Sequence, residues 1–165
     1  MGGRRGQKQA PALTPMRIAL FEPEIAGNVG NVMRLGACMG VGVDLIEPLG
    51  FQWDDRRVRR AAMDYIDHVE IVRHANFEAF RKARSNCRLV LFTTRATLCS
   101  YAFSYRRDDI LLFGKESAGV TDEVRAAVEE SVRLPMRAGV RSLNLATSAG
   151  IALGEALRQT RMLPG

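Results

Sequence analysis

The sequence has few residues that bind metals or form disulfides. It contains three cysteines and two histidines among 165 residues, and no two cysteines form a CxxC pair. The cysteines are Cys38, Cys87 and Cys99, and the histidines are His68 and His74. A structural zinc site needs four such ligands at close spacing, so we expect no metal site. An odd number of widely spaced thiols is typical of a protein in a reducing compartment.

Long apolar segments are also absent. No apolar run approaches the ~18 residues that a transmembrane helix needs. Arg4, Arg5 and Lys8 near the N-terminus are not followed by the apolar core of a secretory signal. With 47% hydrophobic and 25% charged residues, the chain is too apolar to be disordered. We therefore expect a cytoplasmic protein with one hydrophobic core and no membrane segment.

Lysine is scarce although the chain is basic. The chain has 24 basic residues and a net charge of +6, but its only lysines are Lys8, Lys82 and Lys115. Residues 1–15 carry three basic and no acidic side chains, together with glycines and prolines. We expect a flexible basic tail over 1–15 and a single domain over 16–165. The arginine excess permits a polyanionic partner such as nucleic acid, and a solvated charged surface explains it equally well.

Apolar runs alternate with helical patterns along the rest of the chain. The runs are apolar throughout rather than at every second residue, which is typical of parallel strands buried on both faces. The predicted strands cover residues 17–21, 43–47, 69–72, 88–94, 109–114 and 131–135. The predicted helices cover residues 31–39, 54–63, 76–83, 121–130 and 144–161. This alternation predicts an α/β fold with a mostly parallel sheet and helices on both faces. Because ligands of such sheets bind beyond the carboxyl ends of the strands, we expect a site among loops 22–30, 93–97, 114–120 and 135–143.

A glycine- and asparagine-rich segment, GNVGN, follows the first predicted strand. Gly27 and Gly30 permit positive φ and a close approach of a ligand to the backbone. Asn28 and Asn31 are residues that cap a helix, and Arg34 lies one turn further, where it could point at the same opening. A capped turn with a surface arginine is the simpler interpretation. The segment matches neither the dinucleotide fingerprint GxGxxG nor a P-loop.

A carboxylate follows another predicted strand, 109–114, at its carboxyl end. This strand ends on Gly114, and Glu116 comes two residues later inside a loop that Gly119 closes. Glu116 is a candidate binding or catalytic group because of that position. A solvated turn glutamate beside Lys115 is the alternative.

Small polar residues surround the start of the last predicted helix. Ser142 and Asn144 lie where side chains normally cap a helix, and capping accounts for one of them. Ser148 and Gly150 are poor helix formers inside this helix, so we expect close packing there against a backbone or a ligand. No GxSxG motif accompanies Ser142, which argues against a serine hydrolase.

Together the three segments resemble the motifs of the SPOUT-class RNA 2′-O-ribose methyltransferases. The first is similar to that family's N-x-G-N-x-x-R motif, the second to L-x-F-G-x-E-x-x-G and the third to S-x-N-L-x-x-S. The likeness also includes FEPE at residues 21–24 and IEPLGF-WDD at residues 46–55. It spans about residues 17–160 and is greatest to a single-domain subgroup that modifies the wobble nucleotide of tRNA. The chain departs from close relatives at Gly154, where they have tyrosine before the glutamate.

The resemblance implies a fold, a cofactor and partners that the residue pattern alone does not. It implies a C-terminal trefoil knot, S-adenosylmethionine as cofactor, tRNA as substrate and a homodimer. The residues implied for cofactor binding are Phe92, Gly114, Leu134, Met136, Ser142 and Leu143. Those implied for catalysis and for handling ribose and phosphate are Asn28, Arg34, Glu116, Ser142 and Asn144. Methylation of another tRNA position or of rRNA, and an inactive SPOUT-like RNA-binding protein, are the alternatives.

Four further arginines form a dense basic cluster in the predicted helix 54–63. We interpret them as a surface that positions RNA through its phosphates without reading its sequence. A solvated face, with the two preceding aspartates as partners, is the alternative interpretation. The cluster consists of Arg56, Arg57, Arg59 and Arg60.

Overall fold

The computed structural model describes residues 15–62 and 65–165. The predicted tail over 1–15 therefore lies, apart from Pro15, outside the described residues. In the described part, six strands form one sheet in the order β3-β2-β1-β5-β4-β6, and every neighbouring pair is parallel. The strands are β1 (Arg17–Phe21), β2 (Gly42–Ile46), β3 (Ile71–His74), β4 (Leu89–Phe92), β5 (Ile110–Phe113) and β6 (Glu130–Val132). The predicted parallel sheet is confirmed.

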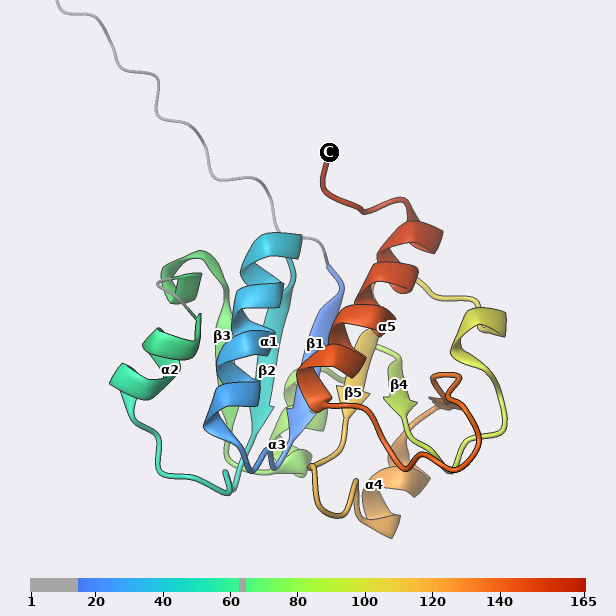
Figure 1. Ribbon diagram of the computed structural model, residues 1–165, viewed down its shortest axis with the longest axis horizontal. Helices are drawn as coiled ribbons and strands as arrows, with labels where there is room; N and C mark the ends of the chain where they lie inside the picture. Colours follow the sequence, from blue (N-terminus) through green and yellow to red (C-terminus); the bar gives the residue numbers. More distant parts are fainter. Residues whose placement is uncertain (1–14, 63–64) are drawn as a thin grey trace, which may run out of the picture.

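Helices cover both faces of this sheet, as predicted (Figure 1). The α-helices are α1 (Ala26–Met39), α2 (Asp55–Ala62), α3 (Phe77–Ala83), α4 (Asp122–Ala127) and α5 (Leu145–Thr160). Two 3₁₀ turns are η1 (Tyr65–His68) and η2 (Ser100–Ala102). One core contains Met33 of α1, Val58 of α2 and Leu153 of α5, and the core on the other face contains Phe80 of α3 and Val124 of α4. The carboxyl ends of the strands lie together at the lower edge in Figure 1.

The first helix begins earlier than the sequence predicts. We expected a loop over 22–30 and a helix from residue 31, but α1 begins at Ala26. Its N-cap is Ile25, which makes no capping bond through its side chain. The expectation that Asn28 and Asn31 cap the helix is therefore wrong. The ends of the other predicted strands and helices differ from the observed ends by at most three residues.

Gly30 lies inside α1 because two helices approach closely there. A Cβ added to Gly30 would lie 2.2 Å from the Cβ of Ala61 in α2, so only glycine fits without moving a helix. Positive φ occurs in the described glycines at Gly40, Gly119 and Gly139. The expectation of positive φ at Gly27 and Gly30 is wrong, since both are helical. Close helix packing, rather than a ligand, explains Gly30.

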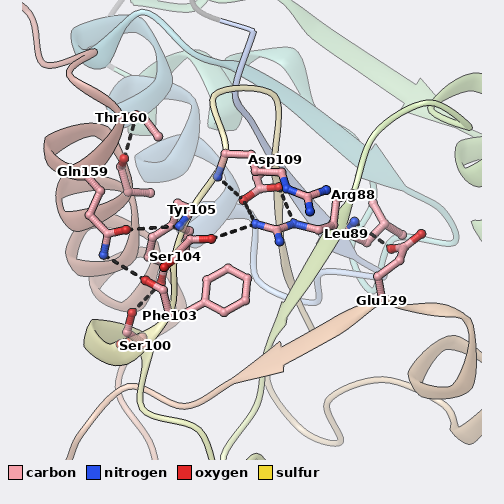
Figure 2. Close-up of polar contacts among 12 residues, drawn as sticks. Arg88, Leu89, Ser100, Phe103, Ser104, Tyr105, Asp109, Glu129, Gln159 and Thr160 are labelled. Carbon is pink, nitrogen blue, oxygen red and sulfur yellow. Dashed lines mark hydrogen bonds and ion pairs between the residues drawn. The ribbon is translucent and has the colours of Figure 1, made fainter.

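The segment between β4 and β5 is bound to the end of α5 (Figure 2). The side chain of Gln159 accepts a bond from the Tyr105 amide at 3.1 Å and donates one to the Phe103 carbonyl at 3.0 Å. At the start of β4, Arg88 donates two bonds, of 2.8 and 2.7 Å, to the carboxylate of Asp109. The bonds of Gln159 hold the segment between β4 and β5 against α5. The bonds of Arg88 join the residues that precede β4 and β5. The trefoil knot that the resemblance implies stays a prediction.

A buried carboxylate gathers cationic groups on the other face of the sheet. Asp44 in β2 is fully buried and accepts bonds from Arg17 Nε at 2.6 Å and Arg84 at 2.9 Å. His74 Nε2 lies 2.8 Å from the same carboxylate. Burial by itself raises the pKa of Asp44, but the hydrogen bonds from Arg17, Arg84 and His74 outweigh it. The pKa of Asp44 therefore lies below its ordinary 3.8.

Candidate active site

A cavity of about 410 Å³ lies beyond the carboxyl ends of β4 and β5, beside the start of α5. We call it the active-site cavity. All six residues implied for cofactor binding line it: Phe92, Gly114, Leu134, Met136, Ser142 and Leu143. Four of the five residues implied for catalysis also line it: Asn28, Glu116, Ser142 and Asn144. The fold thus brings together three motifs that are far apart in the sequence.

The cavity has an apolar base with polar groups at its edge. Phe92 and Phe113, the last residues of β4 and β5, stack with their ring centroids 4.9 Å apart. Thr93, Thr94 and Ser148 add hydroxyl groups to the lining. Both threonines lie in loop 93–97, one of the loops expected to form the site, although neither was named as a site residue. Ser148, where we expected close packing against a backbone or a ligand, lies in the wall of the cavity.

A tight loop after β5 forms one wall of the cavity. Lys115 and Gly119 exchange two backbone hydrogen bonds, of 3.0 and 2.9 Å, which close the loop. Gly119 has a φ of 68°, which glycine adopts without strain. A Cβ added to Gly114 would lie 2.5 Å from the carbonyl carbon of Gly119, so the two sides of the loop meet backbone to backbone.

A chain of hydrogen bonds joins the three motifs inside the cavity. Glu116 accepts bonds from the amide of Glu24 at 2.9 Å and from Nδ2 of Asn28 at 3.2 Å. The Oδ1 of Asn28 in turn accepts a bond of 3.0 Å from Asn144. Asn144 is the N-cap of α5, and its Oδ1 accepts the Thr147 amide at 3.2 Å. Capping thus accounts for Asn144, as expected, and Glu116 is not a freely solvated turn residue.

Glu24 fastens the same loop from the opposite direction. Its Oε1 accepts bonds from the backbone amide of Ser117 at 2.9 Å and from the Ser117 hydroxyl at 2.6 Å. These hydrogen bonds lower the pKa of Glu24 below its ordinary value. The carboxylate of Glu116 also accepts a bond from the Glu24 amide. The loop after β1 and the loop after β5 are therefore each bound by a carboxylate of the other. Glu24 was not among the predicted site residues, and its only signal in the sequence was its place in the FEPE segment.

Arg34 lies apart from the other motif residues. It is exposed on α1 and is not among the residues that line the cavity. Its guanidinium carbon lies 5.6 Å from the ring centroid of Tyr65. Arg34 follows Asn28 by six positions, which places it about 240° further around the helix. The expectation that both side chains point at one opening is not met within this chain.

The described residues show neither a metal site nor a membrane helix. Residues 15–62 and 65–165 contain no group of three or more His, Cys, Asp or Glu side chains that could hold a metal ion. In the same part of the chain, no helix combines the length and apolar character of a membrane span.

Comparison with known proteins identifies the family. A tRNA (cytidine(34)-2′-O)-methyltransferase of Beijerinckia indica is 48% identical over 148 residues, which cover 88% of this chain and 92% of that protein. A structure described as giving insights into the 2-OH methylation of C/U34 on tRNA has a TM-score of 0.83 and 41% identity, and the match covers 87% and 95% of the two chains. An AdoMet-bound rRNA methyltransferase from Sinorhizobium meliloti has a TM-score of 0.80 and 27% identity, with 87% and 56% covered. The SpoU rRNA methylase family matches residues 15–154, and the chain therefore belongs to this family.

Proposed function

We propose that the protein methylates the ribose 2′-oxygen of the wobble cytidine or uridine of tRNA, with S-adenosylmethionine as methyl donor. The observation that carries this proposal is the meeting of three motif segments in one cavity at the carboxyl ends of the strands. The names of relatives at 40–48% identity support the choice of tRNA and of nucleotide 34.

The active-site cavity suits S-adenosylmethionine in size and chemistry. Its volume of about 410 Å³ lies in the range of ordinary ligand sites. Phe92, Leu134 and Leu143 offer apolar surface to an adenine ring, and backbone groups beside Gly114 offer hydrogen bonds. The carboxylate of Glu116 provides negative charge for a cationic ligand. When bound, the cofactor supplies an electrophilic methyl group on a positively charged sulfur.

The ribose 2′-hydroxyl must lose its proton while its oxygen forms a bond to the methyl carbon and the carbon–sulfur bond breaks. Arg34 is not the base, because a guanidinium does not give up a proton in proteins. In this proposal Arg34 binds the adjacent phosphate and stabilises the negative charge that develops on the 2′-oxygen. The proton passes to the phosphate or to water. Because Arg34 does not line the active-site cavity of its own chain, this role requires that the proposed homodimer bring the exposed Arg34 of one copy to the cavity of the other.

Asn28, Glu116, Ser142 and Asn144 have the role of positioning the ribose. Three of these side chains already hold one another through the hydrogen bonds described above. A site that is ordered in this way reduces the entropy lost when the nucleotide is oriented for reaction.

We also propose that the protein is a cytoplasmic homodimer with one domain over 16–165. Several large hydrophobic side chains are exposed in the described part of the chain, among them Ile25, Tyr101 and Ile151. Such side chains are suited to cover one another in a second copy. Sedimentation equilibrium should give twice the mass of the chain, and a mass equal to that of one chain would refute the dimer.

Nucleoside mass spectrometry of tRNA tests the proposed function. Deleting the gene should remove 2′-O-methylcytidine and 2′-O-methyluridine from the wobble position, and purified protein with S-adenosylmethionine should restore them. An unchanged content at that position refutes the assignment. A methyl group lost elsewhere in tRNA or in rRNA identifies the alternative substrate. Calorimetry that detects no binding of S-adenosylmethionine indicates an inactive RNA-binding protein instead.

A further inference from the structure

A second cavity, of about 380 Å³, lies beyond the carboxyl ends of β2 and β3. Its lining includes Glu47, which follows β2, and Arg73 near the end of β3. Phe51 and Trp53, from the segment that leads to α2, complete an aromatic side. We call it the Trp53 cavity. None of its residues has a role in the site described above.

Flat and polar groups meet in this cavity. The guanidinium carbon of Arg73 lies 4.7 Å from the ring centroid of Trp53, and Arg73 also forms an ion pair with Glu47. Although it is stacked, the Arg73 side chain keeps 42% of its surface exposed. Because Glu47 neutralises Arg73, the cavity favours a neutral planar ligand over a phosphate. A planar group gains stacking energy there, and Glu47 can accept its N–H groups.

The Trp53 cavity and the active-site cavity share one edge of the sheet. Only β1 separates the strand pair β3–β2 from the pair β5–β4. From the spacing of neighbouring strands, the two cavities are centred about 14 Å apart. A backbone bond links the segments beside the two cavities. The amide of Gly50, between the lining residues Leu49 and Phe51, donates a 2.9 Å bond to the carbonyl of Pro23, two residues before Ile25 of the active-site cavity. A few nucleotides of single-stranded RNA span this distance.

The helix that follows the Trp53 cavity along the chain, α2, is strongly basic. Helix α2 begins two residues after Trp53, and the indole N–H donates a 2.7 Å bond to Asp55 at its start. The four arginines of the basic cluster are all exposed. Arg59 lies 4.0 Å from the carboxylate of Asp67, but its side chain keeps 52% of its surface. Asp55 and Asp54 are engaged by Trp53 and by the backbone amide of Arg56. This surface therefore offers positive charge to a polyanion whose flat groups enter the cavity.

We propose that the Trp53 cavity binds an unpaired nucleobase of the same RNA whose ribose is methylated, and that α2 binds the neighbouring phosphates. The inference rests on the proposed function, because it assigns a second contact to the same substrate. The base stacks on the guanidinium of Arg73, which Trp53 supports, and donates an N–H to Glu47. The contact fixes the register of the RNA and so selects which ribose reaches the active-site cavity.

Substitutions in the cavity test the proposal by steady-state kinetics on the tRNA that the wild-type chain methylates. Trp53→Ala and Arg73→Ala should each raise KM for tRNA by about tenfold and leave kcat and the affinity for S-adenosylmethionine unchanged. Trp53→Phe, which keeps a flat ring, should retain most of the affinity. Arg81→Ala is the matched control, because Arg81 on α3 is also paired with a glutamate, Glu129, and should leave KM unchanged. If Trp53→Ala fails to fold, Arg73→Ala still decides.

Single abasic substitutions in the anticodon loop identify the bound group. At one position, removal of the base should lower the affinity of the tRNA for the wild-type chain. The same removal should leave the affinity for the Arg73→Ala variant unchanged, because that variant no longer binds the base. The slope of log Kd against log salt should be unchanged in Trp53→Ala and should fall by about 1 in Arg57→Ala. Methylation by the wild-type chain tests the proposed function by itself. If that chain is active while both cavity variants keep the wild-type KM, or if no abasic position distinguishes Arg73→Ala, the proposal for this cavity is refuted.

Discussion

The substitution Gly114→Ala tests the wall of the active-site cavity most directly. The added Cβ would lie 2.5, 2.6 and 2.9 Å from the carbonyl carbon, Cα and carbonyl oxygen of Gly119. Carbon atoms pack best near 3.5 Å, so the facing backbone must move by about 1 Å. The two hydrogen bonds between Lys115 and Gly119 oppose this movement. Losing both costs about 2 kcal/mol of unfolding free energy, which agrees with the usual cost of overpacking.

Two measurements separate the effect on the fold from the effect on the site. Urea denaturation should show the loss of about 2 kcal/mol, and calorimetry should show weaker binding of S-adenosylmethionine, because the displaced loop carries Glu116. Gly150→Ala is the matched control, since an added Cβ there meets nothing within 4 Å. Alanine is the better helix former, so this control should be neutral or up to about 1 kcal/mol more stable.

The outcomes of these measurements refute different steps of the reasoning. A Gly114→Ala variant with the wild-type unfolding free energy would show that the loop yields without cost. A destabilised variant with unchanged affinity for S-adenosylmethionine would show that the cofactor does not contact this wall.

Three further substitutions address the core, the chemistry and the helix packing. Asp44→Asn should cost about 3 kcal/mol of unfolding free energy, because it leaves buried cations without their carboxylate. Since the pKa of Asp44 lies below 3.8, its carboxylate stabilises the wild-type fold fully above about pH 5, and this contribution is lost as the pH falls below 3.8. Urea denaturation at pH values below 3.8 should show a flatter pH dependence for Asp44→Asn, whereas Asp122→Asn, at an exposed pair, should behave as wild type. Arg34→Lys should retain part of the turnover and Arg34→Ala almost none, and full methylation of tRNA by Arg34→Ala would contradict its proposed role. Gly30→Ala should cost about 2 kcal/mol because its Cβ would lie 2.2 Å from that of Ala61, and Ala61→Gly in the same chain should recover part of the loss in thermal unfolding.

The sheet was predictable because its four central strands, β1, β2, β4 and β5, are buried along their whole length. Continuous apolar runs such as that of β1 carry this signal in the sequence, and β1 was predicted at its observed bounds. The segment after it was not predictable in the same way. Glycine and asparagine favour loops when their propensity alone is considered. In the fold, Gly30 packs against α2. The side chain of Asn28 donates a hydrogen bond to Glu116 and accepts one from Asn144. Tertiary contacts therefore decide that the segment is helical.

The site was predictable only as far as its motifs extend. Asn28, Glu116 and Asn144 could be selected from the sequence, but the bonds that join them cross 88 and 116 positions of the chain. No local pattern shows which of these distant residues meet. No local sequence pattern showed the role of Glu24, because that role depends on the backbone amide of Ser117, which is 93 positions away in the chain. Within the chain no backbone packs closely at Gly150, since an added Cβ there would meet nothing within 4 Å, and the alternative of a ligand at this position stays a prediction.

The two cavities are connected by the backbone that separates them. Gly50, which lies between the cavity-lining residues Leu49 and Phe51, donates its amide to the carbonyl of Pro23. The next residue, Glu24, exchanges bonds with the loop that carries Glu116. A Cβ at Gly50 would lie 2.8 Å from the Cα of Glu24, so the two segments leave no space between them. Since close-packed segments hold a fixed spacing, a base bound beside Trp53 lies at a fixed position relative to the wall that carries Glu116. Recognition of the RNA and placement of its 2′-oxygen therefore depend on one continuous structure.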